Sequence, residues 1–177
     1  MKKNLVFLFL LFNFIFFVFA ENNFLIIYLN KNNIDCNLFI DKKINNEIIN
    51  LIYNGYQATI TYEFLLFKKN EGFLVADSLI SKVLINYNLA SYNNKKLKLY
   101  NLNSSIYFDS FQNVEKYLFQ IKIEKLFSLN SKGKYYVKSS FDLETIKLVP
   151  PFSLILIFFK LYNIRVDNLL SNIVEYD

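Results

Sequence analysis

Apolar and polar side chains alternate in two runs between residues 56 and 89. A period of two is typical of a strand that buries one face and leaves the other in water. In the first run the apolar positions are Tyr56, Ala58, Ile60, Tyr62, Phe64 and Leu66. In the second run one face carries Leu79, Val83, Ile85, Tyr87 and Leu89. The polar, glycine-containing segment 68–72 separates the runs, so the pattern predicts two long antiparallel strands joined by a turn.

Shorter segments of the same kind predict five further strands. Two of them lie before the central pair, over Phe24–Leu29 and Ile34–Ile40. Three lie after it, over Lys95–Leu102, Ile121–Phe127 and Tyr135–Glu144. The last of these shows the clearest alternation outside the central pair, and polar turn residues bound most of the segments.

Helical spacing of apolar residues predicts a short helix before the central pair. Asp41 can cap its start, and Gly55 lies where a helix ends with a residue at positive φ. The apolar residues between them recur three and four positions apart, at Ile44, Ile48, Leu51 and Ile52.

A second helix is predicted over 110–120. Asp109 is followed three residues later by Gln112, which is typical of a capping box. The tail, Asn163–Asp177, has a weaker helical pattern.

These elements together predict a mainly β fold, an antiparallel sandwich-like sheet domain with two or three short helices. An α+β arrangement is the alternative. Residues 21–177 are enough for one domain with a sizeable core and hardly enough for two.

The first 20 residues, Met1–Ala20, are typical of a signal peptide. Lys2 and Lys3 precede an apolar run, Leu5–Phe19, that only Asn13 interrupts. As a helix this run spans roughly 22 Å, less than the ~30 Å hydrocarbon core of a bilayer. We therefore favour cleavage after Ala20 over a retained membrane anchor. Either outcome predicts an extracytoplasmic location: periplasm, cell envelope or secreted.

A second apolar run, Phe152–Phe159, follows Pro150 and Pro151. It is too short to cross a bilayer, and we expect it to be buried in the domain. Contact with lipid is the alternative.

Composition argues against disorder and against a nucleic-acid partner. Hydrophobic residues make up 54% of the chain, including 20 Phe and 13 Tyr. The formal net charge is +5, but the lysines are scattered along the chain. An A+T-rich coding sequence would also enrich lysine together with asparagine and isoleucine, whatever the function of the protein. Nucleic-acid binders usually concentrate their positive charge on one face.

Few residues have side chains suited to catalysis or metal binding. The chain has no histidine, and Cys36 is the only cysteine, so imidazole bases, internal disulfides and thiolate or imidazole zinc sites are excluded. Cys36 is either a reactive thiol or a small buried hydrophobe, and we favour the second because no basic residue adjoins it.

Three carboxylates are the remaining candidates for catalysis. Asp142 and Glu144 share one face of a predicted strand, and Asp77 begins another. Two neighbouring carboxylates can act as acid and base, but alternating acids are also ordinary on a wet strand face. We therefore predict no catalytic residue, no cofactor-binding residue, no metal ligand and no cofactor.

Lys95, Lys96 and Lys98 lie between the aromatic residues Tyr92 and Tyr100. Such a segment can bind an anion or single-stranded nucleic acid. It also fits an edge strand that lysines protect from pairing, which we favour. Asn103-Ser104-Ser105 matches the glycosylation acceptor pattern, which matters only in a eukaryotic secretory pathway.

The mature chain resembles a bacterial exported family, the "domain of unknown function 4390" family, from about residue 34 to residue 159. The resemblance is carried by Gly55 before the strand 58–63, Asp77, Tyr87-Asn88, the segments 108–111 and 133–137, and Leu148 with Pro150-Pro151. It implies an exported, β-rich envelope domain with no established activity, and no catalytic residue is carried over from it.

The sequence therefore predicts an exported, non-catalytic bacterial envelope protein that binds a protein or lipid partner through a sheet edge or an apolar groove. One alternative is a membrane-tethered structural or signalling-accessory protein that keeps Met1–Ala20. The other, less favoured, is a carboxylate-dependent hydrolase.

Overall fold

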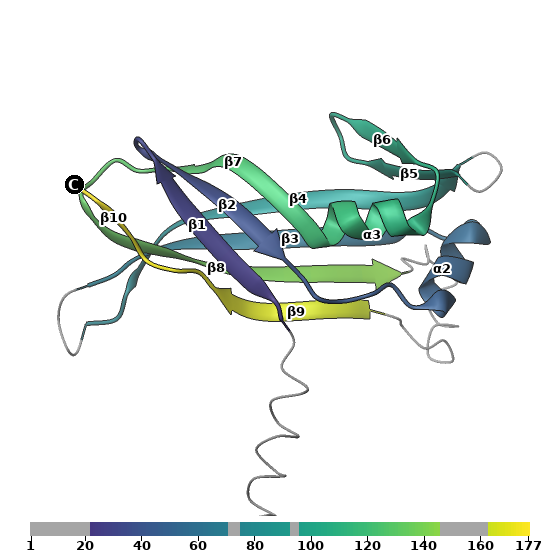
Figure 1. Cartoon of the computed structure of the whole chain (residues 1–177), viewed down its shortest axis with the longest axis horizontal. Helices are drawn as coiled ribbons and strands as arrows, with labels where there is room; N and C mark the ends of the chain where they lie inside the picture. Colours follow the sequence, from purple (N-terminus) through teal and green to yellow (C-terminus); the bar gives the residue numbers. More distant parts are fainter. Residues whose placement is uncertain (1–21, 71–74, 93–95, 146–162) are drawn as a thin grey trace, which may run out of the picture.

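A computed structural model describes residues 22–70, 75–92, 96–145 and 163–177. The predicted leader Met1–Ala20 and the apolar run Phe152–Phe159 lie outside these ranges. The described residues form two antiparallel β-sheets and two short helices (Figure 1), so the prediction of a mainly β, sandwich-like fold is confirmed. Among the described residues no helix is both long enough and apolar enough to span a membrane.

The small sheet has the strand order β1 (Phe24–Asn30), β2 (Asn33–Phe39), β7 (Gln120–Ser128). The large sheet follows the order β10 (Val174–Tyr176), β8 (Gly133–Thr145), β3 (Ala58–Lys68), β4 (Ser78–Tyr92), β5 (Lys96–Tyr100), β6 (Ser105–Phe108). β9 (Asn163–Leu170) pairs with β8 on the same side as β10. The small sheet lies over one face of the large sheet, and the strands of the two sheets cross at an angle (Figure 1).

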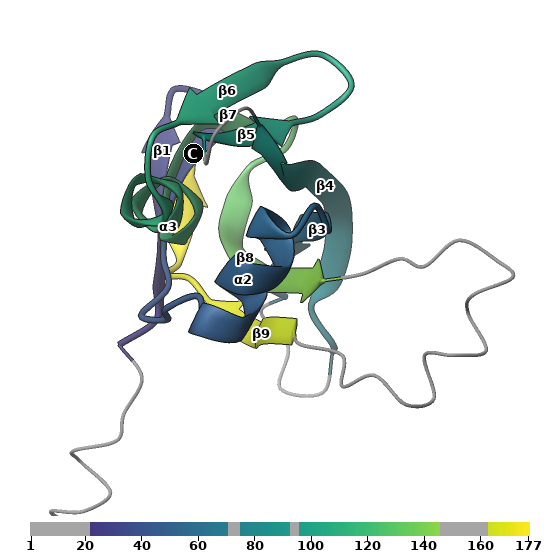
Figure 2. The same cartoon turned by 90° about the vertical axis from the view of Figure 1, so that its right-hand side faces the viewer.

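The core fills the space between the sheets. Inward-facing residues of β3 alternate with half-buried ones, and Tyr62 and Phe64 are fully buried. The helix α2 (Asn46–Tyr53) lies across one end of the two layers and buries Ile48 and Ile52 there (Figure 2). The helix α3 (Phe111–Phe119) leads directly into β7 and buries Val114 and Leu118.

The central strand pair is confirmed, with one shift of register. Ile60 lies opposite Tyr87 and Tyr62 opposite Ile85, as the alternation predicts. A bulge then places Leu66 opposite Ser81 and Phe67 opposite Leu79. One extra residue in β4 reverses the faces of the residues before it, because side chains alternate with a period of two. The prediction that Leu79 shares the inner face of Val83 is therefore wrong, and Leu79 is exposed.

The first helix begins later than predicted. Asp41 does not cap it; the backbone N–H of Asp41 donates to Asn23 Oδ1 at 2.7 Å. Asn45 is the cap, and its Oδ1 accepts the N–H of Ile48 at 2.8 Å. The end of the helix is as predicted, because Gly55 has φ +92° and its N–H donates to the carbonyl of Ile52.

The second helix covers the predicted range, with Ser110 in place of Asp109 as its cap. Ser110 Oγ accepts the N–H of Asn113 at 3.4 Å, whereas Asp109 lies 3.4 Å from Lys96 Nζ.

The weak helical pattern of the tail is a wrong prediction. Residues 163–170 and 174–176 form β9 and β10, both paired with β8. Without them the outer edge of β8 would leave its backbone groups unpaired, and pairing with that edge outweighs a weak helical propensity. Val166 is the residue of β9 that reaches the core.

Candidate functional site

Two strand edges face each other on one side of the molecule, with no strand of the described chain between them. β5 pairs with β4 only over Asn88–Tyr92, so within the described chain the edge of β4 over 78–87 has no strand partner. β7 pairs with β2 on one side, and no described strand pairs with its other side. We call the β4 edge over 78–87, the β7 edge over 120–128 and the groove between them the open seam.

The groove of the open seam has a volume of about 320 Å³. Its lining combines apolar and polar side chains. Ile85, Tyr87, Ile121 and Ile123 are half-buried. Exposed Gln120, Lys122 and Glu124 lie along the β7 side. Such a groove presents apolar side chains and strand backbone together, which is what an added strand needs.

Two tyrosines place hydroxyl groups among these apolar side chains. Tyr87 comes from β4 and Tyr117 from α3, and both line the groove. Burial, and then the neighbouring Tyr117, raise the pKa of Tyr87. The Tyr87 phenol therefore stays neutral near pH 7 and offers hydrogen bonds without charge.

Within the described residues, the β4 edge lacks the usual protection against pairing. Leu79, Ile80 and Leu84 are each more than half exposed along it. Its one lysine, Lys82, forms an ion pair with Glu63 of β3. Natural proteins blunt an open edge with free charge, proline or a covering loop, so a long apolar edge of this kind is open to pairing with another strand.

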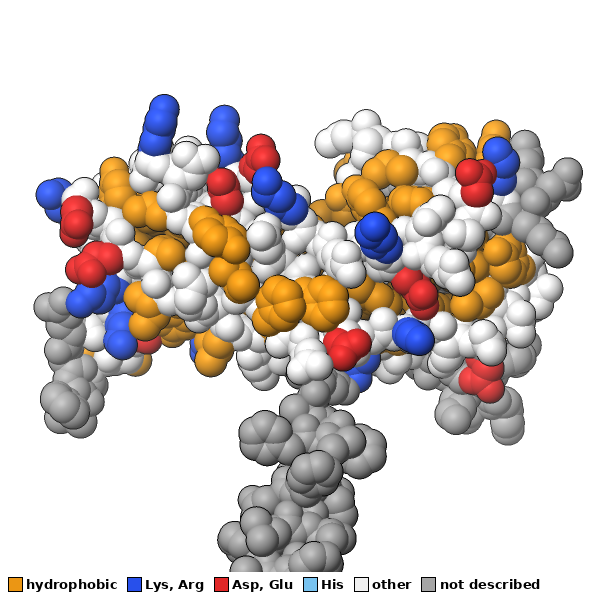
Figure 3. Space-filling view, viewed as in Figure 1, with side chains coloured by type: hydrophobic (Ala, Val, Ile, Leu, Met, Phe, Trp, Pro, Cys, Tyr) orange, Lys and Arg blue, Asp and Glu red, His pale blue; other side chains and the backbone are white. Residues whose placement is uncertain are grey.

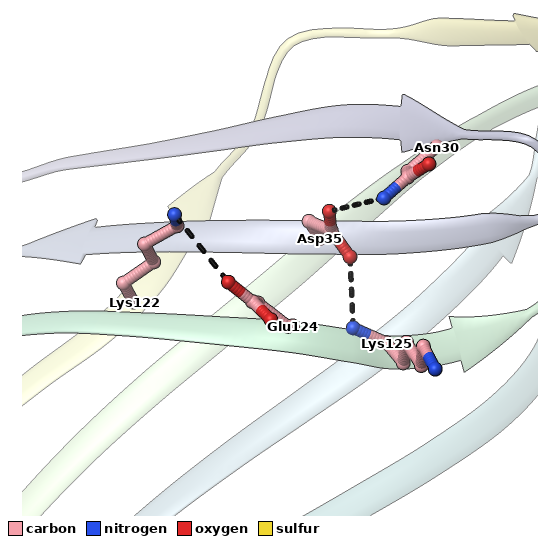
Figure 4. Close-up of polar contacts among 5 residues, drawn as sticks. All are labelled: Asn30, Asp35, Lys122, Glu124 and Lys125. Carbon is pink, nitrogen blue, oxygen red and sulfur yellow. Dashed lines mark hydrogen bonds and ion pairs between the residues drawn. The ribbon is translucent and has the colours of Figure 1, made fainter.

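The β7 edge is shaped by a bulge that Asp35 of β2 holds in place (Figure 4). Lys125 has φ +54°, and its backbone N–H donates to Asp35 Oδ1 at 2.8 Å. Asn30 Nδ2 donates to the other carboxylate oxygen at 3.2 Å. The hydrogen bond from Lys125 is the main cause that lowers the pKa of Asp35. The regular part of the open β7 edge therefore ends at Glu124, which lies 3.5 Å from Lys122 Nζ.

Cys36 lies on the inner face of β2 with no exposed surface. Burial raises the pKa of its thiol to about 12. The preference for a small buried hydrophobe over a reactive thiol is confirmed, because a nucleophilic cysteine needs a lowered pKa and access to solvent.

The structure brings together two of the three candidate carboxylates. Asp142 and Glu144 lie on the outer face of the large sheet with Arg165, in a shallow cavity of about 220 Å³. Burial, and then the charge of Glu144, raise the pKa of Asp142. Asp77 lies elsewhere: its carboxylate accepts the N–H of Asn70 at 3.1 Å and the hydroxyl of Tyr136 at 2.9 Å. Among the described residues no three metal-ligating side chains gather into a group that could hold an ion.

The lysine-rich segment 96–100 is not an edge strand. β5 pairs with β4 on one side and with β6 on the other, so the prediction that its lysines protect an edge is wrong. Lys98 instead places its ammonium group over the rings of Tyr100 and Tyr107, at 5.2 and 5.8 Å from their centroids. Lys95 lies outside the described residues. Asn103, Ser104 and Ser105 are exposed in and after the β5–β6 turn.

Sequence reasoning did not find the open seam. The alternation of Ile121 and Ile123 with Lys122 and Glu124 marks β7 as a strand, but no local signal says that one of its edges stays unpaired. Edge exposure is a property of strand order, and strand order depends on residues far apart in the chain.

Comparison of the chain with protein-family models, with curated proteins and with solved structures finds no match. The resemblance to the "domain of unknown function 4390" family therefore stays a prediction.

Proposed function

We propose that this protein is an exported, non-catalytic domain that binds an extended segment of a partner protein by adding it as a strand in the open seam. The observation that carries the proposal is the pair of facing edges, one on β4 and one on β7, beside an apolar groove. The predicted leader Met1–Ala20 supports export, and the bacterial cell envelope or periplasm is the proposed location.

The kind of partner follows from the two edges. An extended segment has two free edges and can pair with β4 and β7 at once. A strand that already belongs to a folded sheet has at most one free edge. The groove favours a segment with apolar side chains at alternate positions, which would meet Ile85, Tyr87, Ile121 and Ile123. The other positions of the segment would point outward and be polar.

A synthetic probe peptide tests the proposal. We suggest a capped, fluorescein-labelled nonapeptide of alternating valine and threonine with a lysine at each end, and a control peptide whose central residue is proline. The expected result is binding of the first peptide, measured by fluorescence anisotropy, and at least tenfold weaker binding of the second, because proline cannot donate to a strand ladder.

Hydrogen exchange locates the binding. Amides of 78–87 and 120–124 are expected to gain protection, whereas β6, whose outer edge also lacks a described strand partner, serves as the internal control. The Ile121→Thr/Ile123→Thr variant should lose affinity, and Ile106→Thr in β6, also half-buried, should not. Protection confined to β6, or equal binding of the two peptides, would refute the proposal.

Export is tested separately. Mass spectrometry of the protein recovered from its native cells should find a mature chain that begins at Glu21. An intact N-terminus in the envelope fraction would support the membrane-tethered alternative, and an unprocessed chain in the cytoplasm would refute export.

A further inference from the structure

The outer face of the small sheet carries an apolar stripe that no described element covers. Alternate residues of β1 point outward: Phe24 is 46% exposed, Ile26 36% and Tyr28 49%. Phe39 of β2 lies opposite Phe24, and the two rings stack with their centroids 4.9 Å apart. We call these four residues the β1 stripe. Figure 3, taken from the side on which the small sheet overlies the large one, shows apolar side chains gathered across this face.

The β1 stripe differs from the open seam in the kind of contact that it offers. At Ile27 the outer edge of β1 is already engaged, because the side chain of Asn172 binds both backbone polar groups of Ile27. The stripe therefore presents side chains of a sheet face, and whatever covers it must lie flat against them. Three exposed large apolar residues in a row on one strand are more than the single ones that scatter over ordinary surfaces.

The chain before β1 indicates what lies against this face. Four residues separate the end of the apolar run Leu5–Phe19 from Phe24. An extended chain spans at most ~3.5 Å per residue. Phe24 therefore lies within roughly 18 Å of the end of that run. Whenever the run is inserted in a membrane, the Phe24 end of the stripe is held at the membrane surface. On the proposed export route this happens to every copy of the chain before the leader is cleaved.

The charges around the stripe are compatible with this position. The hydrogen bond from Asp41 N–H to Asn23 places Lys42 and Lys43 beside the start of β1. Lys122 lies on the same outer face, at the same register position across the small sheet as Ile26. Asp41 itself adds one carboxylate beside the start of β1, so two lysines and one acid lie there. The acids of the strands lie farther from Phe24: Asp35 is opposite Tyr28 and accepts the N–H of Lys125, and Glu124 pairs with Lys122. Aromatic rings flanked by lysines are typical of protein surfaces that rest at the headgroup level of a bilayer.

We infer that the β1 stripe lies against a lipid bilayer, with Phe24 and Phe39 at the level of the headgroups. The inference rests on the proposed export of the chain but not on the open seam. The seam lies along β7, at the opposite edge of the small sheet from β1. A membrane-bound domain would therefore leave it free for a partner.

The absence of tryptophan from the sequence makes the test direct. Three single-tryptophan variants of the full chain are needed: Phe24→Trp, Tyr28→Trp and the control Tyr107→Trp, which lies in β6 and is more than half exposed. Each is mixed with vesicles of phosphatidylethanolamine and phosphatidylglycerol that carry brominated acyl chains. We expect the emission of the first two variants to shift to the blue and to be quenched at least about twofold more than that of the Tyr107→Trp variant.

The Tyr28→Trp variant separates contact by the stripe from tethering by the leader. Tethering alone would quench the Phe24→Trp variant and leave Tyr28→Trp like the control, which would overturn the inference. A concentration-dependent blue shift without vesicles would show that a second copy of the chain covers the stripe, and it would also overturn the inference. If neither stripe variant differs from the Tyr107→Trp variant, the lipid contact is refuted, and export, which mass spectrometry of the mature chain tests, still stands.

Discussion

The side chain of Asn172 takes the place of a strand beside Ile27. Its Oδ1 accepts the backbone N–H of Ile27 at 2.8 Å, and its Nδ2 donates to the carbonyl of the same residue at 3.0 Å. The adjacent Ser171 makes the equivalent pair with Val137 of β8, through its own N–H at 3.0 Å and its Oγ at 2.9 Å. Two consecutive residues therefore join the small sheet to the large one, on the side opposite the open seam.

Asn172→Ala is expected to lower the free energy of unfolding by about 2 kcal/mol, because both backbone groups of Ile27 lose a partner at a half-buried position. Urea denaturation of the purified protein measures the change. Asn172→Asp should also destabilise, since a carboxylate keeps the acceptor and loses the donor. The matched control is Asn113→Ala on the exposed side of α3, which should cause no loss. Equal stability of the Asn172→Ala and Asn113→Ala variants would show that the link is not significant for stability.

Tyr62→Phe tests how α3 is held on the core. The fully buried Tyr62 hydroxyl donates to the carbonyl of Leu118, in the last turn of α3, at 2.8 Å. The last carbonyls of a helix have no partner within the helix, so removal of the hydroxyl leaves one of them unsatisfied. We expect a loss of about 1–2 kcal/mol in chemical denaturation. Tyr107→Phe, at an exposed ring, should change stability little, and a similar loss in both variants would contradict this role.

Cys36 should label only when the fold opens. The thiol has no exposed surface and a pKa of about 12, so the thiolate is scarce and inaccessible at pH 8. Iodoacetamide is expected to modify the native protein at least on the order of 10³-fold more slowly than the protein in urea. Mass spectrometry of timed samples gives both rates. Rapid labelling without denaturant would show that the small sheet separates readily from the core.

Asp142→Asn should stabilise the protein near pH 7. The pKa of Asp142 is raised in the folded state, so the folded protein binds a proton that the unfolded chain releases. Stability is therefore lost as the pH rises from the ordinary value of 3.8 through the raised value, and the substitution removes that loss. Because the side chain is partly exposed, we expect a gain of no more than about 1 kcal/mol at pH 7 and none near pH 3. Thermal unfolding at both pH values measures the difference, and a lower melting temperature at pH 7 would contradict the expectation.

Asp35→Asn should have the opposite dependence on pH. The pKa of Asp35 is lowered because its carboxylate accepts the N–H of Lys125, so its contribution is present above pH 3.8 and is lost as the pH falls through the lowered value. The substitution is expected to destabilise the β7 bulge at pH 7 and to have a smaller effect at pH 2. Hydrogen exchange of the Lys125 amide at the two pH values reports the change. An exchange rate of that amide that the substitution leaves unaltered at pH 7 would contradict it.

The strands of this protein follow from local pattern wherever one face is buried along their length. The alternation over 58–66 and 135–143 corresponds to β3 and β8, whose inner residues are almost all buried. The predictions are wrong where contacts with residues distant in the sequence determine the local structure. Asp41 binds Asn23, and Asn45 caps the helix instead. The tail forms β9 and β10 because it pairs with the edge of β8.

The candidate site was less predictable than the fold. The same strand pattern describes β5, which has neighbours on both sides, and β4, whose edge over 78–87 has none among the described residues. The exposure of Leu84 could not be predicted from the residues next to it in the sequence, because those residues do not determine whether another strand covers the edge.

The sequence by itself determined the mainly β class, the positions of most strands, the exclusion of histidine chemistry and the burial of Cys36. These depend on residue type and on a period of two, which act over a few residues. Only the tertiary structure decided which edges stay open, which acids share a face and which side chain links the sheets. Those properties arise when segments distant in the chain pair, as Asn172 does with Ile27, and no local pattern encodes such a meeting.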